Sequence, residues 1–273
     1  MEYEKVCALM KKWAVAAGKL VLEALSVESL NIADKARIGD ITSRIDIISE
    51  DFLRTQIQGH FPGHRILGEE VGNSESGSCF TWVLDPVDGT LPMVLGFDYF
   101  GISLGLWEGN IPKISVIYFP KLKVLIWSIT GQGTFIKRKG QITPVRLGTD
   151  KRAVQSFDYP IVAFDFSANR DRKKEIASYF DPLVRLGRYP FMFCCTTYHT
   201  LLLLEGKIHG LVHTGASIYD LGAVVLMVQE AGGDYVVSNT GKRDLGLEEK
   251  SIPIILACNA GALKKIRGIV GHY

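Results

Sequence analysis

The sequence is poor in the features that mark secreted, membrane-spanning and nucleic-acid-binding proteins. It holds five cysteines in 273 residues, without a Cys-x-x-Cys pair or a regular spacing, so neither a disulfide framework nor a structural zinc site is expected. No uncharged apolar run approaches the roughly 20 residues that cross a bilayer. Charged residues interrupt the N-terminal stretch where a secretory signal would carry its apolar core. We therefore expect a soluble, cytoplasmic protein with reduced thiols and no membrane partner.

An excess of charge of either sign is also lacking. The chain has 31 basic and 29 acidic residues, a formal net charge of +2, which gives no reason to expect nucleic acid as a partner. Hydrophobic residues make up 47% of the chain and charged residues 22%, as in a globular protein with a substantial core. The length allows one large domain or two closely packed halves.

The first half of the chain reads as two helices followed by strands. Apolar residues recur at helical spacing from Val6 to Ala24, and a second helix is expected from Ser43 to about His60. A short strand at 65–67 and a loop at 72–78 precede a buried strand at 80–84. Three further strands are expected as antiparallel hairpins, because Gly and Pro separate them, at 99–107, 114–119 and 124–129. Residues 1–148 are thus predicted to form an α+β half.

After about residue 147, strands and helices alternate. Strands are expected at 161–166, 209–212 and 252–257, and helices at 170–180, 197–205 and 219–231. This alternation is typical of α/β architecture. Residues 149–273 are thus predicted to form an α/β half.

Acidic residues stand at four places where chemistry could be concentrated. They are Asp46, Glu69, Glu70, Asp85, Asp88 and Asp220. Asp85 and Asp88 directly follow the apolar run Trp82–Leu84, so they project from the end of a strand, where catalytic groups of α/β proteins often gather. Oxygen ligands without His or Cys suit a hard cation such as Mg²⁺.

Gly89 and Thr90 follow these acids at once. A glycine lets the backbone approach a ligand closely, and successive N–H groups can cradle a phosphate. Acids for a metal beside amides for a phosphate are the layout that metal-assisted phosphoryl transfer to water requires.

Each acid also has a purely structural interpretation. Asp46, three residues after Ser43, could complete a helix cap, and Asp220 could interact with a helix dipole. Glu70 could be a solvated loop charge, while Asp85 and Asp88 could form a turn. The joint occurrence of all these acids in this order favours a functional site.

Taken together, these motifs resemble the signatures of the inositol monophosphatase superfamily. They are Gly68-Glu69-Glu70, the run Asp85-Pro86-Val87-Asp88-Gly89-Thr90, and Tyr219-Asp220 followed by Glu230-Ala231-Gly232-Gly233. Ser43-Arg44-Ile45-Asp46 with Glu50, and Phe61-Pro62-Gly63-His64, are weaker echoes. The resemblance spans nearly the whole chain, in the expected order.

The resemblance implies a set of metal ligands. Glu69, Asp85 and the Val87 carbonyl would bind a first ion, Asp85, Asp88 and Asp220 a second, and Glu69 would help to hold a third. It further implies an α/β fold, a layered αβαβα sandwich, a Mg²⁺ cofactor and a homodimer.

The resemblance also implies how water and phosphate are handled. Asp46, Glu70 and Thr90 would place and deprotonate the attacking water, and the Gly89 and Thr90 amides would bind the phosphate. The expected reaction is the hydrolysis of a small phosphorylated metabolite by water activated by two or three metal ions.

The sequence departs from the family pattern where the substrate would bind. Leu91-Pro92-Met93 follows the Gly-Thr pair, Cys194-Cys195-Thr196 replaces the usual Gly-Ser/Thr-Ala, and Tyr219 replaces the usual Trp, as also seen among histidinol-phosphate phosphatases. His213 stands where inositol enzymes use an acid to bind ring hydroxyls, so His213 and Thr196 are candidate substrate contacts. Because a missing acid leaves sugar hydroxyls unpaired, we expect inositol 1-phosphate, the nominal substrate, to be a poor one.

Other substrates and another class of function stay open. Histidinol phosphate, fructose 1,6-bisphosphate and 3′-phosphoadenosine 5′-phosphate are alternatives within the enzyme class. A non-catalytic protein that binds a phosphometabolite is the rival from a different class. Phosphate release with and without Mg²⁺ separates the enzyme from the binding protein.

Overall fold

The computed structural model describes residues 1–27, 32–34, 41–74, 76–148, 159–166, 173–186, 190–249 and 251–271. The helices up to residue 148 are α1 (Tyr3–Val27), α2 (Arg44–His60) and α3 (Thr90–Val94). The strands of this half are β1 (Ile32–Asp34), β2 (Ile41–Ser43), β3 (Arg65–Gly68), β4 (Gly72–Ser74), β5 (Phe80–Asp88), β6 (Gly101–Glu108), β7 (Ile111–Phe119), β8 (Val124–Ile129), β9 (Gly133–Arg138) and β10 (Gln141–Val145).

The second half is built from shorter elements. Its helices are α4 (Lys173–Leu186), α5 (Thr196–Leu204), α6 (Ile218–Leu221), α7 (Val224–Glu230) and α8 (Ala260–Val270). Its strands are β11 (Val162–Asp165), β12 (Gly210–Ala216), β13 (Asp234–Val237) and β14 (Ile252–Ala257).

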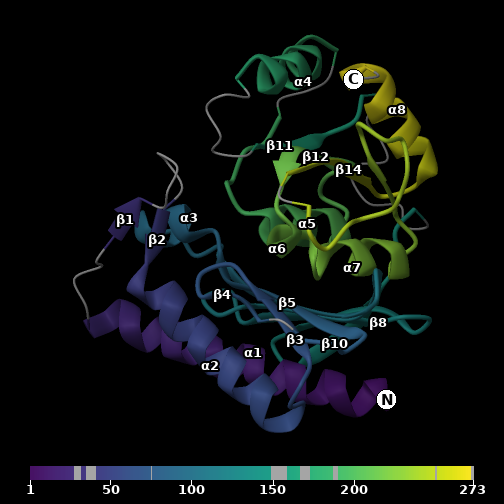
Figure 1. Cartoon of the computed structure of the whole chain (residues 1–273). Coiled ribbons are helices and arrows are strands. Elements are labelled where there is room, and N and C mark those ends of the chain that lie inside the picture. The colour runs from purple at the N-terminus through teal and green to yellow at the C-terminus, as the bar shows by residue number, and fades with distance from the viewer. Residues whose placement is uncertain are drawn as a thin grey trace.

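Two main sheets and three helical layers alternate, which confirms the predicted αβαβα sandwich (Figure 1). Strands β1 and β2 form a separate two-stranded sheet. The large sheet has the strand order β10-β9-β8-β7-β6-β5-β3-β4, and the small one β11-β12-β14-β13. α1 and α2 cover one face of the large sheet, α5, α6 and α7 lie between the sheets, and α4 and α8 cover the small sheet. Each layer buries the apolar face of its neighbour, since a sheet needs cover on its apolar faces.

The apolar side of α1 explains the first interface. Val6, Met10, Trp13 and Ala17 are buried against the large sheet. At Gly18 the helix comes so close to β7 that a Cβ atom would lie 2.8 Å from the Tyr118 ring. No described helix combines the length and the apolar run that a membrane crossing requires.

Several boundaries differ from the sequence-based predictions. Part of the predicted loop at 72–78 is strand β4, paired antiparallel with β3. Strands β1, β2, β10 and β13 and helices α3 and α8 were not predicted. The expected single helix at 219–231 is two helices, α6 and α7, with Gly222 and Ala223 between them. Trp107 Nε1 donates to the Gly222 carbonyl at 2.8 Å, so that carbonyl points to the large sheet.

Other predictions hold within the described ranges. The antiparallel hairpins are confirmed in the pairing of β6 with β7 and of β7 with β8. The start of the predicted helix at 170–180 lies outside the described residues, and α4 continues beyond its expected end. The expected boundary between residues 148 and 149 lies at the end of a described range and stays a prediction.

Candidate functional site

The site begins at the carboxyl end of β5. Asp85 and Asp88 are three residues apart, so in a regular strand they would point to opposite faces. The pairing with β6 is shifted between these two residues: Asp85 faces Ser103 and Asp88 faces Gly101. The one extra residue on β5 is a bulge, and it allows both carboxylates to turn to the same side of the sheet.

Asp220 joins these two acids from the other half of the chain. One carboxylate oxygen from each of Asp85, Asp88 and Asp220 lies within 4.8 Å of the other two. Asp220 sits in a capping box: its Oδ2 accepts from the Ser217 backbone N–H at 2.6 Å, and Ser217 Oγ accepts from the Asp220 N–H at 3.2 Å. Asp220 thus caps the start of α6, and the same geometry also aims it at the acids of β5.

Helix α5 holds the Asp88 side chain. The backbone N–H of Thr196 donates to Asp88 Oδ1 at 3.2 Å, and that of Thr197 donates to Asp88 Oδ2. The Cys195 thiol donates to Oδ2 at 3.3 Å. Burial, and then the nearby Asp220 charge, raise the pKa of Asp88 to about 6. The carboxylate is thus fixed in position, and a cation between the acids would relieve their repulsion.

Thr90 lies beside the same strand end. Its hydroxyl donates to Asp46 Oδ1 at 2.7 Å and lies 3.1 Å from the Val87 carbonyl. Asp46 is buried in the first turn of α2, and two of the three residues expected to handle the water, Asp46 and Thr90, are therefore within hydrogen-bonding distance. Gly89, between Asp88 and Thr90, has φ 90°, a conformation that strongly favours glycine.

Glu50 arranges the loop of the two adjacent glutamates. Its Oε2 accepts from the Glu70 N–H at 2.7 Å, and its Oε1 lies 2.7 Å from Arg54 Nε. Glu50 is fully buried, and a Cβ atom on Gly68 would lie 2.0 Å from it. Tyr219 is the neighbour of Asp220 in the chain, and burial raises its pKa. The charge of Glu69 raises this pKa further, more than that of any other acid.

The candidate substrate residues are buried. His213 lies in β12 and its Nδ1 accepts from the Gly215 N–H at 3.1 Å, while Thr196 turns its backbone N–H to Asp88. Cys194 has φ 51°, the left-handed conformation that a glycine adopts without cost. The substrate contacts of His213 and Thr196 stay predictions.

Sequence reasoning missed four residues of this region: Glu50 and Thr197 as supports of acidic groups, Cys195 as a thiol donor to Asp88, and Asp165. Glu50 was noted as part of a motif, but its partners are distant in sequence. Asp165 directly follows an apolar run, as Asp85 does, so the same pattern could have indicated it.

The donor set fits a hard divalent cation. Three carboxylates converge, and burial raises the pKa of the Cys195 thiol, so the thiol stays protonated and donates a hydrogen bond instead of acting as a soft ligand. Oxygen-only sites of this kind suit Mg²⁺, Mn²⁺ or Ca²⁺.

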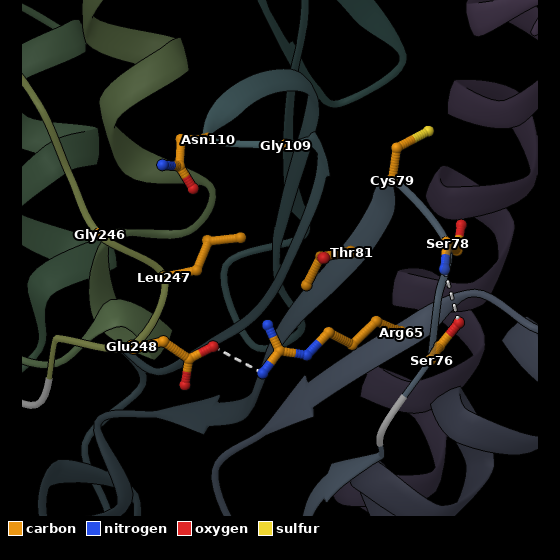
Figure 2. A pocket seen from close by; sticks show the side chains of 10 residues that line it. All are labelled: Arg65, Ser76, Ser78, Cys79, Thr81, Gly109, Asn110, Gly246, Leu247 and Glu248. Carbon is orange, nitrogen blue, oxygen red and sulfur yellow. Dashed lines mark hydrogen bonds and ion pairs between the residues drawn. The ribbon is translucent and has the colours of Figure 1, made fainter.

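A separate hollow of about 550 Å³ lies at the other end of β5 (Figure 2). Arg65, Ser78, Thr81 and Asn110 line it, and Arg65 Nη2 is paired with Glu248 Oε1 at 2.6 Å. This hollow offers hydroxyls and a neutralised cation instead of converging acids. We therefore place the functional site at the carboxylates.

Comparison with known proteins agrees with this assignment. The profile of the Inositol monophosphatase family matches residues 2–265. A fructose-1,6-bisphosphatase/inositol-1-monophosphatase of Aquifex aeolicus is 27% identical over 86% of this chain and 86% of its own length. A histidinol-phosphatase of Mycobacterium tuberculosis is 27% identical over 75% of this chain and 76% of its own length.

The fold agrees as well. The crystal structure of the extragenic suppressor protein suhB from Bartonella henselae superposes with a TM-score of 0.83 at 22% identity, covering 97% of this chain and 98% of that one. Since the family profile covers nearly the whole chain and the acidic cluster lies in the matched region, the chain belongs to the inositol monophosphatase family of metal-dependent phosphatases.

Proposed function

We propose that this protein hydrolyses the phosphomonoester of a small metabolite with Mg²⁺ as cofactor. The convergence of Asp85, Asp88 and Asp220 carries the proposal. These acids, with Glu69 and the Val87 carbonyl, are the residues that would hold the metal. When bound, Mg²⁺ supplies the positive charge that neutralises the phosphate and activates water.

The protein's own groups supply orientation and proton transfer. The Thr90 hydroxyl, polarised by Asp46 at 2.7 Å, accepts a hydrogen bond from the attacking water, and Glu70 helps to take its proton. The N–H groups of Gly89 and Thr90 bind the phosphate oxygens, since Gly89, in its left-handed conformation, places no side chain between the backbone and a ligand.

Phosphate release from a panel of phosphomonoesters, with Mg²⁺ and with chelator, tests this function. We expect release that depends on Mg²⁺ and that Asp220→Asn nearly abolishes, while Asp181→Asn, on the exposed face of α4, matches wild type. Binding of phosphometabolites without turnover of any ester would instead support the non-catalytic rival.

The finer substrate assignment follows from the residue at position 213, where the substrate would bind. Inositol phosphate is the nominal substrate of the family, but a buried imidazole at His213 does not offer the two anionic acceptors of a carboxylate to neighbouring hydroxyls. We therefore expect myo-inositol 1-phosphate to have a lower kcat/KM than at least one other ester. His213→Glu should shift the preference back towards inositol phosphate, by ~1–3 kcal/mol in transition-state binding. A strong wild-type preference for inositol phosphate would contradict this interpretation.

We also propose a homodimer in a reducing, cytoplasmic setting. Leu95, Phe97, Phe191 and Met192 are exposed apolar side chains. Ring contacts through Tyr99 and Phe193 link Phe97 to Phe191, and apolar patches of this kind are typical of interfaces. All five thiols are free. Light scattering of wild type and Phe97→Lys would reveal the dimer and its weakening.

A further inference from the structure

Asp165 stands where the second half of the chain approaches the acidic cluster. It ends strand β11, and its partner in the parallel pairing with β12 is His213. Both side chains are buried. Paired residues on neighbouring strands lie on the same face of a sheet, with strands about 4.8 Å apart. Because parallel strands end at the same edge, Asp165 and His213 share the edge from which β12 continues to Asp220.

The surroundings of Asp165 contain a neutral histidine. His199 Nε2 accepts from the Phe193 N–H at 3.0 Å, so the ring proton of the neutral form is on Nδ1, which lies 3.5 Å from Asp165 Oδ2. Burial, with a contribution from His213, lowers the pKa of His199 to about 3. His199 therefore supplies no positive charge to Asp165 at neutral pH.

The charges that act on Asp165 are acidic. Burial raises the pKa of Asp165 to about 8, and Asp88 and Asp220 add to the shift, while the Phe166 N–H donates to its Oδ1 at 3.0 Å. Burial, and then the charges of Asp165 and Asp88, also raise the pKa of the Cys194 thiol. The Cys195 backbone also bonds the Asp165 carboxyl, and the Cys195 thiol donates to Asp88 Oδ2 at 3.3 Å, so Asp165 lies close to the reaction centre. A buried carboxyl there keeps its proton until a cation reaches it and stabilises the ionised form.

We propose that Asp165 determines specificity by binding a cationic nitrogen on the leaving group of the substrate. The inference rests on the proposed phosphatase function and adds the substrate class: phosphate esters of amino alcohols. Inositol enzymes carry an acid at the position of His213. Here Asp165, the partner of His213 on the neighbouring strand, supplies a carboxyl instead. An ammonium group stabilises the ionised form of this carboxyl and donates to it, whereas a hydroxyl leaves the carboxyl protonated and forms only a neutral hydrogen bond.

Pairs of substrates that differ in one group test this assignment. We would measure kcat/KM with Mg²⁺ for 2-aminoethyl and 3-aminopropyl phosphate and for the matching hydroxyethyl and hydroxypropyl phosphates. At least one amine should exceed its hydroxyl counterpart by about 10-fold or more, chiefly through KM. Asp165→Asn should lower that ratio by a similar factor, and Asp181→Asn should leave it unchanged.

The outcomes separate this inference from the proposed function. Turnover of the esters without preference for an amine, or a preference that persists in Asp165→Asn, overturns the role of Asp165 alone. If no ester is turned over, the result counts against the proposed phosphatase function. Calorimetric titration of the Mg²⁺-loaded protein with the amine and hydroxyl esters then decides whether the amine is bound more tightly. If Asp165→Asn does not fold, competitive inhibition of the wild type by 3-aminopropanol against 1,3-propanediol decides it.

Discussion

The Thr90 hydroxyl connects the catalytic strand end to Asp46 of helix α2, beside the hydrogen bond from the Ser49 hydroxyl of α2 to the Pro86 carbonyl. Thr90→Ala removes the group that orients water while the metal acids stay in place. We expect turnover to fall by roughly 10²–10⁴ and the free energy of unfolding to change by about 1 kcal/mol or less. Steady-state kinetics and urea unfolding measure the two effects. Thr130→Ala, which removes an exposed hydroxyl that bonds the Pro112 carbonyl, is the matched control, and near-normal turnover in Thr90→Ala would refute the role.

Cys195 is another residue whose effect is local. Its thiol donates to Asp88, and groups that orient a metal ligand typically change metal affinity. Cys195→Ala should weaken Mg²⁺ binding by roughly 10-fold, whereas Cys195→Ser, which keeps a donor, should weaken it less. Calorimetric titration with Mg²⁺ gives both dissociation constants. Equal affinity in wild type and Cys195→Ala would show that the backbone N–H groups of α5 are sufficient.

At the scale of the element, α5 carries a buried neutral histidine into the core. The pKa of His199 is lowered to about 3, so between pH 6.5 and 3 the unfolded state binds a proton that the folded state does not. Stability from this group is present above pH 6.5 and is lost as the pH falls. From pH 7 to pH 5, wild type should lose about 2 kcal/mol more than His199→Asn. Urea unfolding at both pH values measures the difference, and parallel losses in the two proteins would exclude His199 as the cause.

Elements with a strong period were predictable, and short ones were not. The apolar spacing of α1 and the Gly and Pro breaks between β6, β7 and β8 identify these elements without the fold. Strand β4 has only three residues, Gly-Asn-Ser, and exists because β3 pairs with it. Gly222 is only a weak signal for the break between α6 and α7, because helices tolerate an isolated glycine. The hydrogen bond from Trp107 to the Gly222 carbonyl comes from a strand more than a hundred residues earlier.

Across the whole molecule, the two halves meet where Gly105 of β6 touches Gly222. A Cβ atom on Gly105 would lie 2.2 Å from the Gly222 carbonyl oxygen, and a backbone atom cannot move aside alone. Gly105→Ala should destabilise the protein by about 1–3 kcal/mol or more and weaken Mg²⁺ binding, because α6 and Asp220 are displaced from β5.

Thermal unfolding and calorimetric titration with Mg²⁺ measure these two effects. Gly59→Ala is the control, since nothing lies near its Cβ position in α2 and alanine favours a helix. Gly105→Ala with wild-type Mg²⁺ affinity would show that the interface does not position Asp220.

The sequence by itself determined the kind of chemistry: the Asp85–Thr90 run, the two adjacent glutamates and Asp220 are local patterns, and oxygen ligands beside phosphate-binding amides suit few reactions. Only the tertiary structure decided how these groups meet. The bulge in β5 turns Asp85 and Asp88 to one side, the contact at Gly222 brings Asp220 to them, and the parallel pairing of β11 with β12 sets Asp165 beside His213. Strand register and the contact between two sheets depend on residues far apart in the chain, so no local pattern encodes them.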